Sequence, residues 1–189
     1  FIALMKALFI FATMMALTCI NTFAQEIPEP EFVGEVVAIL PDGNTTNLEK
    51  EQVVTRTRAN AGALIAGIGK VKTKIVIESP SASVRLKPTD EIKLIVKAVD
   101  NQSDPLSIIK IFSFDVTKTK RLAEIASMST FGSMKNNKLE YLRFSAEKYG
   151  NQSYLITLKD KPKGEYGITV SNPNQKDEKE IIVSTFAIE

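Results

Sequence analysis

The chain has 189 residues, with 24 Lys and Arg against 22 Asp and Glu, and it contains no His, no Trp and one cysteine, Cys19. This near-neutral balance gives no indication of a nucleic-acid partner. The lack of His removes the commonest general base and the commonest metal ligand. One cysteine cannot form an internal disulfide. The composition therefore favours neither histidine-based catalysis nor a disulfide framework, and we predict no cofactor and no metal site.

Residues 1–24 have the pattern of a secretory signal peptide. Lys6 precedes an uncharged, mostly apolar run, Ala7 to Ile20, which is too short to span a bilayer because a spanning helix needs ~20 residues. Small residues follow, and we expect cleavage after Ala24. Residues 1–4 precede Met5, and we interpret them as upstream read-through.

The expected address is the periplasm or the cell surface of a bacterium, with no integral membrane segment after cleavage. An alternative is that Cys19 becomes a lipid-modified N-terminus. The preceding Ala16-Leu17-Thr18 matches a lipobox poorly, because it lacks Leu at −3 and Ala or Gly at −1. Cleavage after Ala24 is therefore the favoured interpretation.

After the leader we expect three parts. Residues 25–31 (QEIPEPE) are rich in Pro and Glu and predict an extended tether. Residues 32–60 predict an N-terminal β arm, with one helical turn over 48–52 as an open possibility. Residues 61–189 predict a β-sandwich body.

Short strands separated by Gly, Pro, Asn and Asp dominate the body. Residues 71–77 alternate apolar side chains with Lys, a period of two that indicates a strand with one solvated face. Residues 108–116 (IIKIFSFDV) are apolar on both faces and predict a strand in the sheet interior. Residues 118–127 predict a strand or a short helix, and residues 127–137 the longest loop. Further strands are expected over 83–86, 92–98, 139–146, 153–159, 165–170 and 181–188.

About ten short strands at this spacing predict an all-β fold, an immunoglobulin-like β-sandwich with an N-terminal strand arm. An α+β fold with one helix over 118–126 is the alternative. Tyr166 sharpens the prediction because it follows a Pro–Gly turn near the start of a strand. In immunoglobulin-like sandwiches, a Tyr at that corner buries its ring and hydrogen-bonds nearby backbone.

Four runs of the chain resemble uncharacterised secreted proteins of Bacteroidetes-type bacteria. They are Gly67 to Thr73 (GIGKVKT), Gly164 to Val170 (GEYGITV), Asn172 to Asn174 (NPN) and Val183 to Phe186 (VSTF). The resemblance covers most of the chain after the leader. It implies secretion and a β-rich fold, and it brings no activity, cofactor or site residue.

Motifs that would indicate chemistry fail on spacing. Gly67-x-Gly69 lacks the third Gly of a dinucleotide fingerprint and the frame of a P-loop. Ser145 and Lys148 have the Ser-x-x-Lys spacing, but on a strand these two positions point to opposite faces. Asp100, Asn101 and Asp104 could hold a hard cation, but the loop lacks the Asp-x-Asp-x-Asp-Gly frame of a calcium loop, so a solvated turn is the favoured interpretation.

We therefore expect a non-catalytic binding or scaffold module of the bacterial envelope, with another envelope protein or surface component as its partner. The predicted contact is the apolar set Met128, Phe131 and Met134 within the 127–137 loop. The alternative is a purely structural role, in which Phe131 folds back to cap the sandwich. A self-associating surface subunit that pairs through edge strands, and an envelope hydrolase, are the second and third functional hypotheses.

Overall fold

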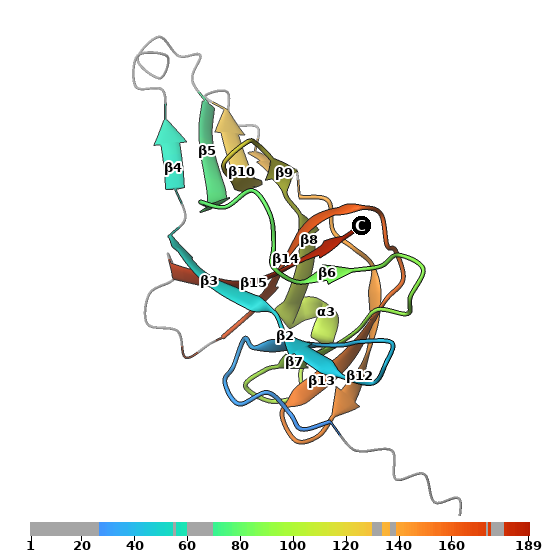
Figure 1. Ribbon diagram of the computed structural model, residues 1–189. Coiled ribbons are helices and arrows are strands. Elements are labelled where there is room, and N and C mark those ends of the chain that lie inside the picture. Colours follow the sequence, from blue (N-terminus) through green and yellow to red (C-terminus); the bar gives the residue numbers. More distant parts are fainter. Residues whose placement is uncertain are drawn as a thin grey trace, which may run out of the picture.

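The computed structural model describes residues 27–54, 56–59, 70–129, 134–136, 139–172, 174 and 180–189. The prediction of an all-β fold is confirmed, since strands make up 51% of the chain and helix 3%. The strands form three sheets, here called A, B and C (Figure 1). Among the described strands, all pairings but one are antiparallel.

Sheet A holds five strands, in the order β12 (Phe144–Tyr149), β13 (Ser153–Leu158), β7 (Lys93–Lys97), β1 (Val36–Ile39) and β2 (Thr45–Asn47). Sheet B runs in the order β3 (Glu49–Val54), β15 (Glu180–Ile188), β14 (Gly164–Val170) and β8 (Ile109–Ser113), and β6 (Arg85–Leu86) pairs in parallel with β15. Sheet C runs in the order β11 (Met134–Asn136), β10 (Arg121–Ser129), β5 (Lys70–Ile77) and β4 (Arg56–Ala59), and β9 (Asp115–Val116) pairs with β10. One short helix, α3 (Pro105–Ile108), precedes β8.

Sheet B lies between the other two sheets and contributes apolar side chains to a core on each of its faces. Ile109 and Ile111 belong to the core shared with sheet A, which also contains Leu94 and Ile156. Phe112 belongs to a second cluster on the opposite face. The expected burial on both faces is therefore confirmed for these positions, because each face of the sheet meets another sheet. The expected place in the sheet interior is wrong, since β8 is the edge strand in the described order of sheet B and residues 115–116 form the separate, exposed strand β9.

Sheet C covers the second face of sheet B. Its contribution to that cluster is Ile75, Ile77 and Ala123, which pack with Phe112 and Phe114 from the β8–β9 segment. The two rings meet edge-on, with centroids 5.3 Å apart. The chain passes from sheet B into sheet C at β8–β9, so this segment ties the two layers together (Figure 1).

The strands of residues 32–59, expected in an N-terminal arm, are distributed over all three sheets. β1 lies between β7 and β2 in sheet A, β3 pairs with β15 in sheet B, and β4 pairs with β5 in sheet C. The possible helical turn over 48–52 is wrong, because residues 49–54 form β3. Pairing with β15 supplies the backbone hydrogen bonds that a local helix would otherwise have made.

The segment Ile27–Glu31, expected in the tether, is held against the β12–β13 turn. The Glu29 carboxylate accepts hydrogen bonds from the backbone N–H groups of Asn151 and Gln152, at 2.7 and 3.0 Å. It also accepts from the Ser153 hydroxyl at 2.6 Å and lies 3.2 Å from Lys97 Nζ. These donors, the Ser153 hydroxyl first, lower the pKa of Glu29 to about 2.

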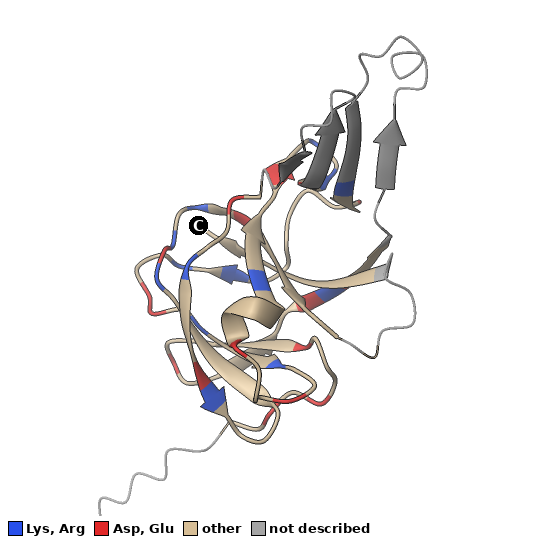
Figure 2. Cartoon of the chain, turned by 180° about the vertical axis from the view of Figure 1, so that it is seen from behind, with Lys and Arg blue, Asp and Glu red and all other residues tan. Residues whose placement is uncertain are grey.

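Charged residues of both signs are interspersed along the described strands and loops, as Figure 2 shows from behind. This mixture agrees with the small net charge of +2. A local excess of one sign is therefore informative where it occurs.

Candidate functional site

The candidate site begins at the short turn of helix that leads into β8. The Asp104 carboxylate accepts a hydrogen bond from the Leu106 backbone N–H at 2.9 Å and caps α3, and Pro105 occupies the first turn. This geometry leaves the Leu106 side chain 57% exposed. Lys110 Nζ donates to the Leu106 carbonyl at 2.5 Å, which ties the helix to the strand behind it.

Residues 140–142 form the opposite wall by running along the outer edge of β8. Ser113 N–H donates to the Glu140 carbonyl and Leu142 N–H donates to the Ile111 carbonyl, both at 3.0 Å. Tyr141 therefore forms an antiparallel β-bridge with Phe112 and is 43% exposed, while Leu142 is buried. The chain then enters β12 in sheet A, so this wall connects the edges of two sheets.

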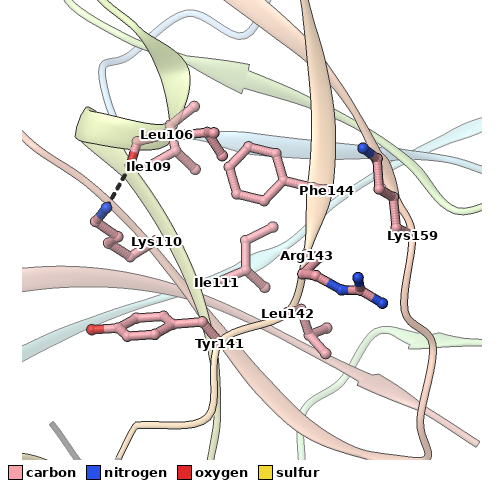
Figure 3. Close-up of a pocket in the computed structure, with 9 residues that line it drawn as sticks. All are labelled: Leu106, Ile109, Lys110, Ile111, Tyr141, Leu142, Arg143, Phe144 and Lys159. Carbon is pink, nitrogen blue, oxygen red and sulfur yellow. Dashed lines mark hydrogen bonds between the residues drawn. The ribbon is translucent and has the colours of Figure 1, made fainter.

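Between these walls lies a groove of about 540 Å³ (Figure 3). Its floor is apolar and comes from the core shared by sheets A and B. The volume lies within the range of small-ligand sites, which is ~300–1,000 Å³. We call this feature the β8–β12 groove; its lining residues are Leu106, Ile109, Lys110, Ile111, Tyr141, Leu142, Arg143, Phe144 and Lys159.

The groove has a positively charged rim. Three of its nine described lining residues are cations, and none of the nine is an acid. In Figure 3, Lys110 lies on one side of the floor, and Arg143 and Lys159 lie on the other. The Lys159 backbone N–H donates to the Arg143 carbonyl at 2.9 Å, which fixes these two residues side by side.

Among the rim cations, Arg143 forms an ion pair with an acid in the described part of the chain. Its Nε and Nη2 donate to the two Asp160 carboxylate oxygens at 2.7 and 2.8 Å. This bidentate pair raises the pKa of Arg143 and lowers the pKa of Asp160, in both cases mainly through the hydrogen bond. The Lys159 charge makes a smaller contribution to the lowered pKa of Asp160, and the described lining residues contain no acid to offset the three cations.

The residues predicted from sequence as a partner contact lie elsewhere. Met128 is at the end of β10 and Met134 at the start of β11, and they are opposite one another in the pairing register of sheet C. Phe131 lies outside the described residues. The expected loop over 127–137 needs correction, since residues 127–129 and 134–136 form a hairpin of two paired strands. The β8–β12 groove lies between sheets A and B.

The polar positions considered from sequence have structural partners. Ser145 and Lys148 lie on β12, and the Lys148 amine donates to the Gln102 side-chain oxygen at 3.3 Å. Asp100 accepts from the Gln102 N–H at 2.8 Å, and the Asn101 amide donates to the Gly150 carbonyl at 3.1 Å. Within the described ranges, no group of three or more His, Cys, Asp or Glu side chains is placed to hold a metal ion.

Sequence reasoning missed the groove, although one local signal was available. Asp104 followed by Pro105 is a helix-start pattern, and it marks the point where α3 begins. The other walls could not be found this way, because residues 106–111, 141–144 and 159 are brought together only by sheet pairing.

Comparisons with family models, with curated proteins and with solved structures found no match for this chain. In the portion that the structure describes, no helix is long and apolar enough to cross a membrane.

Proposed function

We propose that this protein is a non-catalytic binding or scaffold module of the bacterial envelope, and that the β8–β12 groove receives an apolar part of its partner. The observation that carries the proposal is the groove itself, an open hollow of about 540 Å³ with an apolar floor. Concave, mostly apolar sites with a few polar groups at the rim are the common form of a binding site.

The chemistry of the lining favours binding over catalysis. The nine described lining residues contribute one phenol, two amines and one guanidinium, and no carboxylate, thiol or aliphatic hydroxyl. A nucleophile beside a general base is the usual core of a hydrolytic site. The residues around this groove lack that pairing, whereas their apolar side chains suit a hydrophobic contact.

An immunoglobulin-like sandwich is the fold we propose for sheets A and B. These two sheets pack face to face around one core. Tyr166 supports the proposal, because its ring is buried and its hydroxyl donates to the Pro162 carbonyl at 2.8 Å. This is the hydrogen bond expected of a corner tyrosine in such sandwiches.

Export is the second part of the proposal, and the apolar leader with its single Lys6 supports it. Intact-mass measurement of the protein from the envelope fraction should give a chain that begins at Gln25. A chain that begins at Met5, or one with a lipid on Cys19, would contradict this part of the proposal.

Self-association through edge strands is a second candidate function. It is favoured by β12, which lies at the edge of sheet A and pairs only with β13 among the described strands. Light scattering over a concentration series separates the two functions. A constant mass favours the binding module, and growth without a limit favours the structural subunit.

Binding of an uncharged apolar dye, Nile red, tests the groove directly. The test variant is Leu106→Ser with Tyr141→Ser, because both side chains are exposed and their loss should not unfold the protein. We expect the double variant to bind the dye about tenfold more weakly, since it removes apolar contact area at both walls. Val116→Ser is the matched control, because Val116 is a 53% exposed apolar residue on β9 and away from the groove. Equal dye binding by all three proteins would refute the groove as the binding site.

A further inference from the structure

We infer that the partner segment received by the β8–β12 groove is acidic as well as apolar: a stretch of another protein in which an apolar side chain is flanked by Asp or Glu. This inference rests on the proposed function and specifies the partner's chemistry. Its basis is the coincidence of an apolar floor with a rim that carries three cations and no acid among the described lining residues.

The three cations come from three different parts of the chain. Lys110 belongs to β8, Arg143 precedes β12, and Lys159 follows β13. They surround one apolar floor because two sheet edges and the helix α3 meet here. A partner carboxylate on either side of an inserted apolar side chain would therefore meet a positive charge.

The cations keep unused hydrogen-bonding capacity. A Lys amine has three donors and Arg has five. Lys110 uses one donor on the Leu106 carbonyl, and Arg143 uses Nε and Nη2 on Asp160. The Lys159 amine makes no hydrogen bond with the described residues, although its charge contributes to the lowered pKa of Asp160. Its donors can therefore meet an incoming carboxylate.

Two acidic side chains close in sequence to the lining residues already have partners within the chain. Asp160 binds Arg143, and its pKa is lowered mainly by that contact. Asp104 caps the N-terminus of α3. The described lining residues themselves carry only positive charge toward an occupant, although the whole chain is close to neutral.

A protein segment fits the walls better than a small anion does. Leu106 and Tyr141 lie on the two opposite walls of the groove, and they are 57% and 43% exposed. Large exposed apolar side chains beside a pocket enlarge the contact area, which is typical of sites for protein partners. The polypeptide would place its apolar side chain on the floor and its backbone against these two residues.

The test uses three synthetic peptides of equal length with a central Phe, flanked on both sides by Asp, Asn or Lys, each competing with Nile red. We expect the Asp peptide to bind about fivefold more tightly than the Asn peptide, and the Lys peptide to bind most weakly, since exposed ion pairs have small individual effects. High salt should remove the difference between the Asp and Asn peptides, because salt screens exposed charges.

Lys159→Met should remove most of the preference for the Asp peptide over the Asn peptide, and the affinity of this variant for Nile red is measured alongside as the reference for both peptides. Lys163→Met is the matched control, because Lys163 is an exposed cation outside the lining. Equal binding of the Asp and Asn peptides, with Nile red still bound, would overturn this inference and leave the proposed function standing. Failure of Nile red to bind the wild-type protein would overturn both this inference and the proposed function. The same titration with decanoate tests a small anionic amphiphile as the occupant. If decanoate displaces the dye as effectively as the Asp peptide does, and with the same dependence on Lys159, the inference of a protein segment is overturned in favour of such an amphiphile.

Discussion

The Arg121 guanidinium lies 3.7 Å from the Glu165 carboxylate, and Arg121 is completely buried. Arg121 comes from β10 of sheet C and Glu165 from β14 of sheet B, so the pair joins the two layers. Glu165 also accepts from the Ala82 N–H at 2.7 Å and from Arg85 Nη1 at 3.2 Å. Arg121 has fewer partners: its Nε donates to the Ser79 carbonyl at 3.1 Å, and its two terminal nitrogens have no hydrogen bond.

This asymmetry predicts that the two partners differ in their effect on stability. Glu165→Gln leaves a buried guanidinium without its counter-charge and should lower the free energy of unfolding by about 3–5 kcal/mol. Arg121→Met leaves Glu165 with Arg85 and the Ala82 amide, and should lower it by roughly half as much. Urea unfolding of both variants measures the difference. A larger loss for Arg121→Met would contradict the assignment of Arg121 as the less satisfied partner.

The contact of Glu29 with the β12–β13 turn predicts a dependence of stability on pH. The folded-state pKa of about 2 lies below the ordinary value of 4.5, so the contact stabilises the fold fully above pH 4.5. The stabilisation is lost as the pH falls from 4.5 through about 2. Glu29→Ala should lower the free energy of unfolding by about 1–3 kcal/mol at neutral pH, because it removes several hydrogen bonds to a charged group.

The control for Glu29 is Glu31→Ala, which removes an exposed carboxylate two residues further along the chain. Urea unfolding should find this control close to the wild type at neutral pH. The gap between the wild type and Glu29→Ala should narrow steadily in acid. A gap that is constant with pH would show that Glu29 does not titrate with a lowered pKa.

Gly167 predicts a close-packing limit on the face of sheet B that sheet C covers. A Cβ atom at this position would lie 2.9 Å from ring atoms of Phe112 and Phe114 and 2.9 Å from Val183 Cγ1. Gly167→Ala should therefore lower the free energy of unfolding by about 1–3 kcal/mol, as overpacked cores do. Thermal unfolding measures this loss. An unchanged or raised melting temperature would mean that the two rings can move aside freely.

The partner contact predicted from the sequence at Met128, Phe131 and Met134 is the alternative to the β8–β12 groove. If these residues form the partner contact, replacing all three with Ser should abolish partner binding and leave the melting temperature unchanged. If the β8–β12 groove is the contact, the same triple variant should bind Nile red and the Asp peptide as the wild type does. The dye titration used for the groove decides between the two sites.

Alternating sequence patterns predicted the strands well where one face is apolar. Residues 153–159 and 165–170 were expected as strands, and they form β13 and β14 with nearly the same bounds. The possible helical turn over residues 48–52 was wrong because Glu, Lys and Gln favour helix in isolation. In the fold, β3 instead forms its backbone hydrogen bonds with β15. Residues 127–137 consist mostly of small and polar residues, so their pattern gave no sign that β10 and β11 pair there.

The candidate site could not be predicted from the sequence, because its residues are distant along the chain. Phe144 and Ile111 read as ordinary core residues, and both are indeed buried. The cationic side chains near them read as ordinary solvated positions. Only the pairing of residues 140–142 with the edge of β8 brings these residues around one hollow.

The most direct measurement is a two-dimensional amide NMR titration of the protein with the Asp-flanked Phe peptide. We predict that the shifted amides cluster at residues 106–111, 141–144 and 159, and that Lys159→Met reduces these shifts. Shifts that cluster at residues 127–136, or that spread evenly over the chain, would contradict the claim that the β8–β12 groove is the binding site.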